Sequence, residues 1–187
     1  MWFWQRWSWE RDRRRRAERF VLGLQREPDP AAVHWLARHG AHGDVDHARW
    51  ELRYARRALG LISAGRDALD DDTASFVSAA LGASLRRDPA IPAPSLERVE
   101  RQLAARVRSY SEALGARRAG VSVVTQLGTA LLAFAGPGSD AESGAVEGAA
   151  DIMRAYLDEA NAALVDCFGA AALPENVAPS ASPQPTR

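Results

Sequence analysis

AGVSVVTQLGTALLAFAG, residues 119–136, is a run of eighteen residues without a formal charge, around which the rest of the chain has to be arranged. Read as a helix, it is apolar on both sides, with Val121 and Leu131 on one and Val123 and Phe134 on the other. Such a helix lies in a protein core or in lipid. A membrane span needs about 20 predominantly apolar residues, and this run is shorter and interrupted by polar side chains. We therefore expect it to form the central buried helix, with a membrane segment as the alternative.

Apolar side chains recur at helical spacing through most of the remaining chain, which predicts amphipathic helices that pack around this core. The clearest pattern follows Asp44, a good N-cap, and consists of Val45, Ala48, Leu52, Ala55, Leu59 and Ile62. Further helices are expected at about 8–26, 31–39, 73–87, 96–114 and 145–168, with Gly40 ending the second and Ser95 capping the fifth. No segment reads as a strand. The sequence predicts an all-α, single-domain helical bundle of five to six helices, with the last two long helices at its centre.

The chain divides by composition into three parts. Residues 1–10 form an arm rich in Trp and Arg, residues 11–172 carry the helical patterns, and residues 173–187 are rich in Pro and Ser with few large apolar side chains. Such a tail cannot bury enough apolar surface to fold, so we expect 173–187 to be disordered.

Composition excludes several kinds of chemistry. All 24 basic residues are Arg, and without lysine there is no Walker phosphate loop and no Schiff-base or pyridoxal-phosphate enzyme. Cys167 is the only cysteine, which excludes an intrachain disulfide and a multi-thiolate metal site, and its apolar setting predicts a buried thiol. The N-terminus lacks a continuous apolar segment of the secretory kind, so we expect a cytoplasmic protein, with membrane association left open.

Charge is distributed unevenly along the chain, although its net charge is zero. Residues 1–118 hold 22 basic and 16 acidic residues, a net of +6, and residues 119–187 hold 2 and 8, a net of −6. The two parts attract each other, which favours packing of one on the other and argues against a uniformly basic surface for nucleic acid.

The N-terminal arm is the leading candidate for function. Indole rings beside guanidinium groups suit a protein interface or an anionic membrane surface. The predicted partner-binding residues are Trp2, Phe3, Trp4, Arg6, Trp7, Trp9, Arg13 and Arg14. A nucleic-acid partner is disfavoured, a homo-oligomer is left open, and the alternative structural role is that these rings cover the bundle's own core. The sequence thus favours a non-enzymatic accessory protein that docks through this arm.

A cluster of histidines and acids between positions 34 and 51 provides an alternative from another class. Imidazole and carboxylate groups are ligands for zinc or iron, and His47 and Glu51 would share one helix face. The candidate ligands are His39, His42, Asp44, His47 and Glu51. No cofactor is predicted otherwise; a divalent metal would make the protein a helical metalloprotein or metal-dependent enzyme. The competing interpretation is a polar turn between two helices.

The segment ARRAGVSVVT, residues 116–125, resembles the turn of a helix-turn-helix of the lac-repressor type. The resemblance implies a transcriptional regulator whose recognition helix starts near Ser122 and presents Thr125 and Gln126. That helix has no basic residue for the phosphate backbone, so DNA binding is the weakest of the three alternatives.

Overall fold

The structure is a computed structural model that describes residues 2–67, 71–116, 120–136 and 143–169, without the side chains of residues 2–6, 67, 71 and 143. Within these residues the chain forms helices only, which confirms the all-α prediction, but the described α-helices number seven and not five to six. They are α1 (Trp2–Leu24), α2 (Pro30–His39), α3 (Val45–Asp67), α4 (Asp71–Arg87), α5 (Leu96–Gly115), α6 (Val123–Ala135) and α7 (Ser143–Phe168), with a 3₁₀ helix, η1 (Ala93–Ser95), before α5. The predicted tail 173–187 lies outside the described residues.

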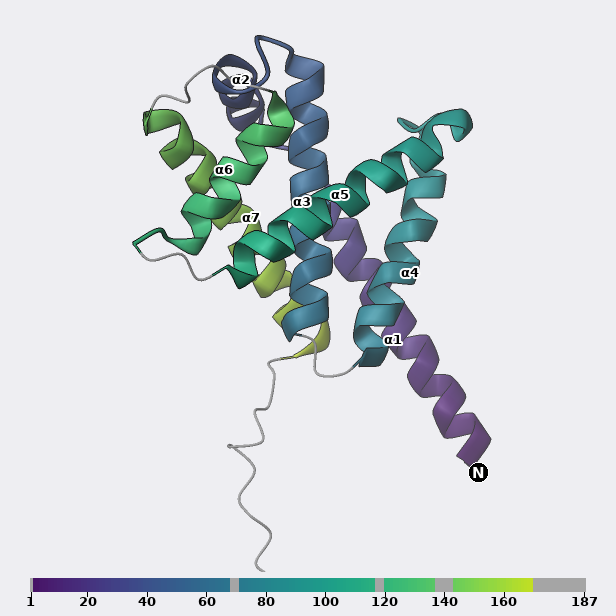
Figure 1. Ribbon diagram of the computed structural model, residues 1–187. Coiled ribbons are helices and arrows are strands. Elements are labelled where there is room, and N and C mark those ends of the chain that lie inside the picture. Colours follow the sequence, from purple (N-terminus) through teal and green to yellow (C-terminus); the bar gives the residue numbers. More distant parts are fainter. Residues whose placement is uncertain (1, 68–70, 117–119, 137–142, 170–187) are drawn as a thin grey trace, which may run out of the picture.

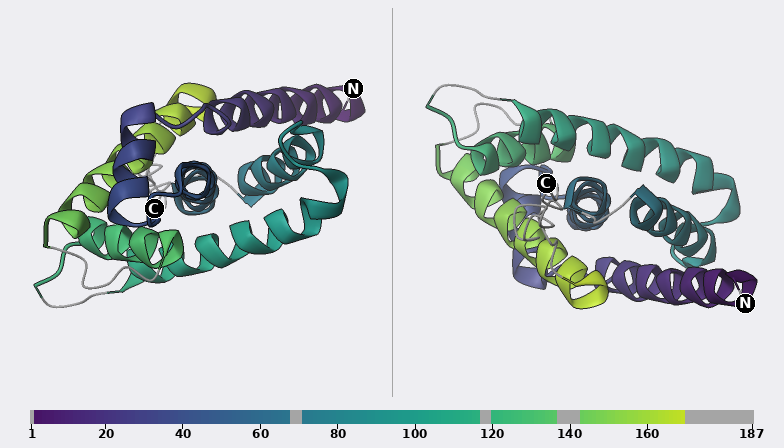
Figure 2. Two further views of the ribbon diagram at one scale, coloured as in Figure 1. Left: turned by 90° about the horizontal axis from the view of Figure 1, so that it is seen from above. Right: turned by 90° about the horizontal axis from the view of Figure 1, so that it is seen from below.

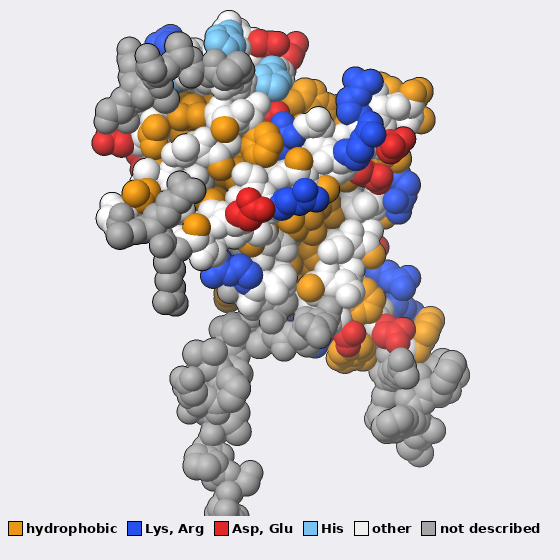
Figure 3. Space-filling view, in the orientation of Figure 1, with side chains coloured by type: hydrophobic (Ala, Val, Ile, Leu, Met, Phe, Trp, Pro, Cys, Tyr) orange, Lys and Arg blue, Asp and Glu red, His pale blue; other side chains and the backbone are white. Residues whose placement is uncertain are grey.

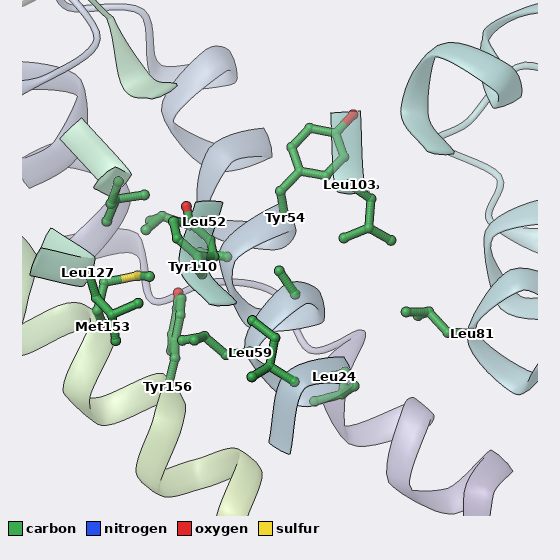
Figure 4. Packing of buried hydrophobic residues seen from close by; sticks show 14 of the residues in the cluster. Leu24, Leu52, Tyr54, Leu59, Leu81, Leu103, Tyr110, Leu127, Met153 and Tyr156 are labelled. Atoms are coloured by element: carbon green, nitrogen blue, oxygen red, sulfur yellow. The ribbon is translucent and has the colours of Figure 1, made fainter. Parts of the chain in front are cut away.

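Helix α3 is the centre of the bundle. It packs against every other α-helix in the described chain, and when the molecule is viewed along α3 the other helices surround it (Figure 2). Leu52 and Leu59 of α3 are fully buried and meet side chains of α5, α6 and α7, among them Tyr110, Leu127 and Met153 (Figure 4). The prediction that residues 119–136 provide the central helix is therefore wrong.

Helix α6 lies at the side of the bundle and packs mainly against α7 (Figure 1). Leu127 and Leu131 on its inner face are fully buried, whereas Val121 just before it and Val123 at its start are 43% and 39% exposed. The expectation of burial on every face is thus wrong as well. No helix in the described part of the chain is long and apolar enough to cross a membrane.

The backbones of α6 and α7 lie in close contact at Gly128. A Cβ atom on Gly128 would lie 2.6 Å from the backbone nitrogen of Ala150 and 2.9 Å from the carbonyl oxygen of Val146, closer than real Cβ contacts. Helices α1 and α3 also approach closely, since a Cβ atom on Gly60 would lie 2.3 Å from a methyl carbon of Leu24. Gly128 requires glycine because the backbone of α7 occupies the space of a side chain, whereas at Gly60 the space is taken by the side chain of Leu24, which could move.

Helix α1 crosses α4 and packs against it, and its N-terminal end projects past the start of α4 (Figures 1 and 2). The helix begins at Trp2 and ends at Leu24, whereas the sequence suggested about Ser8 to Arg26. The Trp/Arg arm and the first helix are consequently one continuous element. From Trp7, where its described side chains start, the first buried residue of α1 is Ala17.

The local signals at helix ends were predicted with mixed success. Asp44 caps α3 as expected, because its Oδ1 accepts a hydrogen bond from the backbone N–H of His47 at 2.9 Å. Ser95 makes no capping hydrogen bond, since it belongs to η1 and has helical backbone angles. The chain leaves α2 at Gly40 with a φ of −134°, and the left-handed positions are His42 and Gly43 beyond it. A tight turn that includes a non-glycine residue therefore joins α2 to α3.

Candidate functional site

The projecting part of α1 exposes two of the predicted docking residues. Trp7 is 50% exposed and Trp9 is 42% exposed. A guanidinium group one turn further along covers each ring, with Arg11 4.7 Å from the ring centre of Trp7 and Arg13 4.5 Å from that of Trp9. Arg13 also donates a hydrogen bond to the hydroxyl of Thr73 at the start of α4. These cation–π pairs favour the observed orientations of the indole rings by about 0.5–1 kcal/mol each.

The structure describes the other predicted docking residues in less detail. Arg14 is exposed, and the side chains of Trp2, Phe3, Trp4 and Arg6 lie outside the described residues, although their backbone belongs to α1. The structure thus places two Trp–Arg pairs on a projecting helix.

The predicted metal ligands lie near the α2–α3 turn, where histidine side chains gather at the top of Figure 3. The His39 ring lies against Trp35 with ring centroids 4.9 Å apart, a Cβ atom on Gly136 would lie 3.3 Å from the His42 ring, and Asp44 caps α3 through the backbone N–H of His47. In the described residues, no three His, Cys, Asp or Glu side chains are arranged to hold a metal ion. The structure does not assemble the predicted ligand set.

Glu51 shows most clearly why that set does not form. Its side chain is 2% exposed and both of its oxygens accept hydrogen bonds from Arg106 of α5, at 2.6 Å from Nη2 and 3.1 Å from Nε. Nη1 of Arg106 donates to the side chain and the backbone carbonyl of Gln102. The guanidinium lies 5.0 Å from the ring centre of Tyr54 and 4.2 Å from that of Phe134. This carboxylate forms a buried ion pair in which both oxygens face the Arg106 guanidinium, whose positive charge opposes a metal ion at the same place.

Gln126, one of the two residues expected to contact DNA bases, is buried in the bundle. Gln126 is 7% exposed, and its amide donates to the backbone carbonyl of Ala116 at 3.3 Å. The Ser122 hydroxyl accepts from the backbone N–H of Thr125 and caps α6. Part of the predicted turn, residues 117–119, lies outside the described residues. Gln126 therefore joins α6 to the end of α5 and is not presented to solvent.

Sequence reasoning missed a group of arginines on α3. Arg53, Arg56 and Arg57, together with Glu51, are called the α3 charge cluster below. Arg56 donates to the backbone carbonyl of Arg26 at 2.8 Å, lies 3.2 Å from a carboxylate oxygen of Glu159, and covers the ring of Tyr156. These contacts connect α3 to the end of α1 and to α7.

Arg53 and Arg57 connect α3 to other segments. Arg53 pairs with Glu27 in the α1–α2 connection and lies 4.8 Å from the ring centre of Trp50. Arg57 donates through Nη2 to Asp88, just after α4, at 2.9 Å. The α3 charge cluster thus reaches segments on several sides of the bundle.

One signal in the sequence could have revealed this arrangement. The face of α3 opposite the predicted apolar stripe carries Trp50, Tyr54 and Leu61 among its charges. A helix with large apolar side chains on both faces has neighbours on both faces, so its charged residues had to be buried and paired.

Burial also affects the tyrosines around α3. It raises the pKa of Tyr156 to about 12, although Arg56 nearby acts in the opposite direction. It raises the pKa of Tyr54 despite the opposing effect of Arg106, and it strongly raises the pKa of Tyr110. These phenols are neutral and form part of the packing around the charged groups.

Cavities occur on several sides of α3. One of about 620 Å³ lies among α1, α3 and the end of α4, and another of about 500 Å³ lies over the Glu51–Arg106 pair. Helices α4 and α5 diverge from their connection, and the space between them is an apolar groove lined by Leu61, Leu81 and Val107 (Figure 3). The first cavity has more charged residues in its lining than the groove, where only Glu100 and Arg108 are charged.

Comparison with known proteins identifies no relative: the chain matches no family profile, no curated protein and no solved structure.

Proposed function

We propose that this protein is a non-enzymatic accessory protein that docks onto an acidic surface of a protein partner through the projecting part of α1. The observation that carries the proposal is the pair of exposed indole rings, each covered by an arginine, on a helix end that extends beyond the bundle. Tryptophan and arginine contribute most of the binding energy at many protein interfaces. The cation–π contacts favour one orientation of each ring before binding, which lowers the entropy cost of docking.

The charge of this segment supports an acidic partner surface. Residues 7–16 contain five arginines and two acids, and one of the acids, Asp12, is paired with Arg16 at 2.7 Å. Arg14 and Arg15 are exposed beside them. A partner with carboxylates around an apolar pocket would complement both the charge and the rings.

The arrangement of the rings favours a protein over a membrane. Trp7 and Trp9 are two residues apart and therefore point about 200° apart around the helix axis, and exposed charged residues lie on every side of residues 10–16. A helix that rests on lipid needs one continuous apolar face. A protein partner that contacts two sides of α1 can bind both indole rings.

The decisive experiment uses the full chain with a photo-reactive amino acid at position 8, in place of Ser8, and a second version with it in place of Val165, an exposed apolar residue on α7. We expect position 8 to crosslink in cells to a defined acidic protein that position 165 does not capture. Replacing both Trp7 and Trp9 with alanine should weaken binding of that protein about 30-fold or more, whereas Val165→Ala should leave it unchanged.

Three outcomes would contradict the proposal. The first is equal crosslinking from the two positions, and the second is unchanged affinity in the double tryptophan variant. The third is retention on phosphatidylserine vesicles without any protein crosslink, which would favour the membrane alternative. Deleting residues 1–10 should leave thermal unfolding unchanged; collapse of the shortened chain would mean that these rings cover the core instead.

A further inference from the structure

The cavity of about 620 Å³ among α1, α3 and α4 is of a size that holds small molecules. Four arginines line it: Arg19 of α1, Arg53 and Arg57 of α3, and Arg87 of α4. Three acids also line it, Glu18, Glu27 and Asp88, of which Glu27 is paired with Arg53 and Asp88 with Arg57, so the arginines exceed the acids by one. The walls therefore carry an excess of positive charge.

Arg57 is the unusual member of this set. Its side chain is 3% exposed, and only Nη2 is engaged, by Asp88 at 2.9 Å. The Nε and Nη1 atoms are buried and have no hydrogen-bond partner within the described residues. A buried polar group left without a partner is costly, and the cost is greater for a charged one.

Arg106 provides a matched comparison in the same core. It pairs with a buried carboxylate as Arg57 does, but all three of its nitrogens donate hydrogen bonds, two to Glu51 and one to Gln102. The fold is thus capable of satisfying a buried guanidinium completely. At Arg57, in contrast, two of the three guanidinium nitrogens have no acceptor among the described residues.

We propose that this cavity binds a small molecule through a phosphate or carboxylate group, with Arg57 as the buried anchor and Arg87 at the mouth. An oxyanion provides several acceptor atoms together with the negative charge that the cavity lacks. A water molecule would supply an acceptor without that charge. Arg87 uses Nε to donate to the backbone carbonyl of Ala83 at 3.1 Å, which leaves its terminal nitrogens for an incoming anion.

The test measures binding of inorganic phosphate and, separately, of acetate to the full chain by calorimetry at constant ionic strength, with chloride as the reference anion. One anion should bind saturably with one site per chain, and the ¹⁵N–¹H signal of the Arg57 Nε group should shift as the site fills. Binding of phosphate alone indicates a phosphorylated ligand, and binding of acetate alone indicates a carboxylate; either supports the site.

Three variants locate the binding. Arg57→Lys keeps the ion pair with Asp88 but removes the guanidinium donors, and it should weaken binding about tenfold or more. Arg87→Gln should weaken it several-fold and serves as the second test if Arg57→Lys does not fold. Arg154→Gln, an exposed position on α7, is the matched control and should have no effect.

The proposal is overturned if neither anion binds saturably. It is also overturned if Arg87→Gln and Arg154→Gln reduce binding equally, which would indicate general charge screening. An Arg57 Nε signal that stays unchanged while another region of the protein responds would place the anion elsewhere and likewise overturn it.

Discussion

Helix α3 carries charged residues and is buried, whereas α6 has no charged residue and is partly exposed. Helix α3 carries Glu51, Arg56 and Arg57, all buried, and lies among the other helices. Helix α6 has no charged residue in its sequence, yet it packs at the side with Val123 39% exposed. Length does not explain the difference, because α1 has the same 23 residues as α3 and α7 has 26. Helix α3 packs against every other α-helix in the described chain, whereas α6 packs mainly against α7.

The comparison shows that burial of a helix depends on the partners that its polar groups find as well as on its apolar content. Each charged side chain of α3 that is buried meets a carboxylate, a guanidinium or a backbone carbonyl from another segment. The cost of removing these groups from water is offset by that pairing. On α6 the apolar residues that lack neighbours simply stay exposed, which costs a folded protein little.

The largest expected effect comes from breaking the central ion pair. Glu51→Leu leaves the Arg106 guanidinium buried without a counter-charge and should lower the free energy of unfolding by about 3–5 kcal/mol in urea titrations. The double variant Glu51→Leu with Arg106→Met should recover most of this loss. Asp151→Ala, which breaks an exposed pair with Arg154, should cost less than about 1 kcal/mol. A loss after Glu51→Leu no larger than this control would contradict the central role of α3.

The second effect concerns the face of α3 toward α7, where Arg56 covers Tyr156. Because the folded-state pKa of Tyr156 is raised from 10.0 to about 12, the folded protein holds a proton that the unfolded chain releases first. The stabilisation of the folded state that results from this pKa difference is complete below pH 10 and is lost as the pH rises through 12. It amounts to about 2–3 kcal/mol.

Urea titrations from pH 9 to 12 should therefore show stability falling more steeply for the native sequence than for Tyr156→Phe. Some slope should remain in the variant because Tyr54 and Tyr110 are shifted in the same direction. Parallel curves for the two proteins would show that the Tyr156 phenol is hydrated in the folded state.

The third effect compares a glycine of α6 with one of α3. Gly128→Ala places a methyl group against the backbone of α7, which cannot yield as a side chain would, and should cost about 1–3 kcal/mol. Gly65→Ala on α3 meets nothing within 4 Å and should be neutral or add up to about 1 kcal/mol, because alanine favours a helix. Thermal unfolding of the two variants measures the difference, and a harmless Gly128→Ala would mean that α6 and α7 are not in close contact.

The smallest effect tests the exposed side of α6. Val123→Glu should change the free energy of unfolding by no more than about 0.5 kcal/mol, since the residue is 39% exposed and an acid in the first turn suits the helix dipole. Calorimetry on the purified variant is sufficient. A loss of several kcal/mol would restore the original expectation that this stretch is buried on every side.

The periodicity of apolar residues was sufficient to predict the helices. It located α2, α3, α4 and α7 closely, and Asp44 was predicted correctly as the cap of α3, because both signals depend on residues near in sequence. The arrangement of the helices could not be predicted in this way. The uncharged stretch contains the most apolar helix, and nothing local indicates that α3 has neighbours on every side.

The candidate sites show the same limit. The sequence left open whether Trp7 and Trp9 are exposed or cover the core, and the choice of Glu51 as a metal ligand failed because its partner, Arg106, is 55 positions away. Arg57 was overlooked for a similar reason, since its burial depends on α1 and α4 together. Residues whose role depends on distant partners lie beyond what spacing along one helix can reveal.

The α3 charge cluster has a consequence for how this chain folds. Arginine cannot release its proton to enter the core as lysine can, so Arg56, Arg57 and Arg106 must be paired at the moment they leave water. The groups that pair with α3 come from the α1–α2 connection, the residue after α4, helix α5 and helix α7. A partly assembled bundle would hold α3 against some neighbours with other charges uncompensated. Folding should therefore be strongly cooperative, with few populated intermediates.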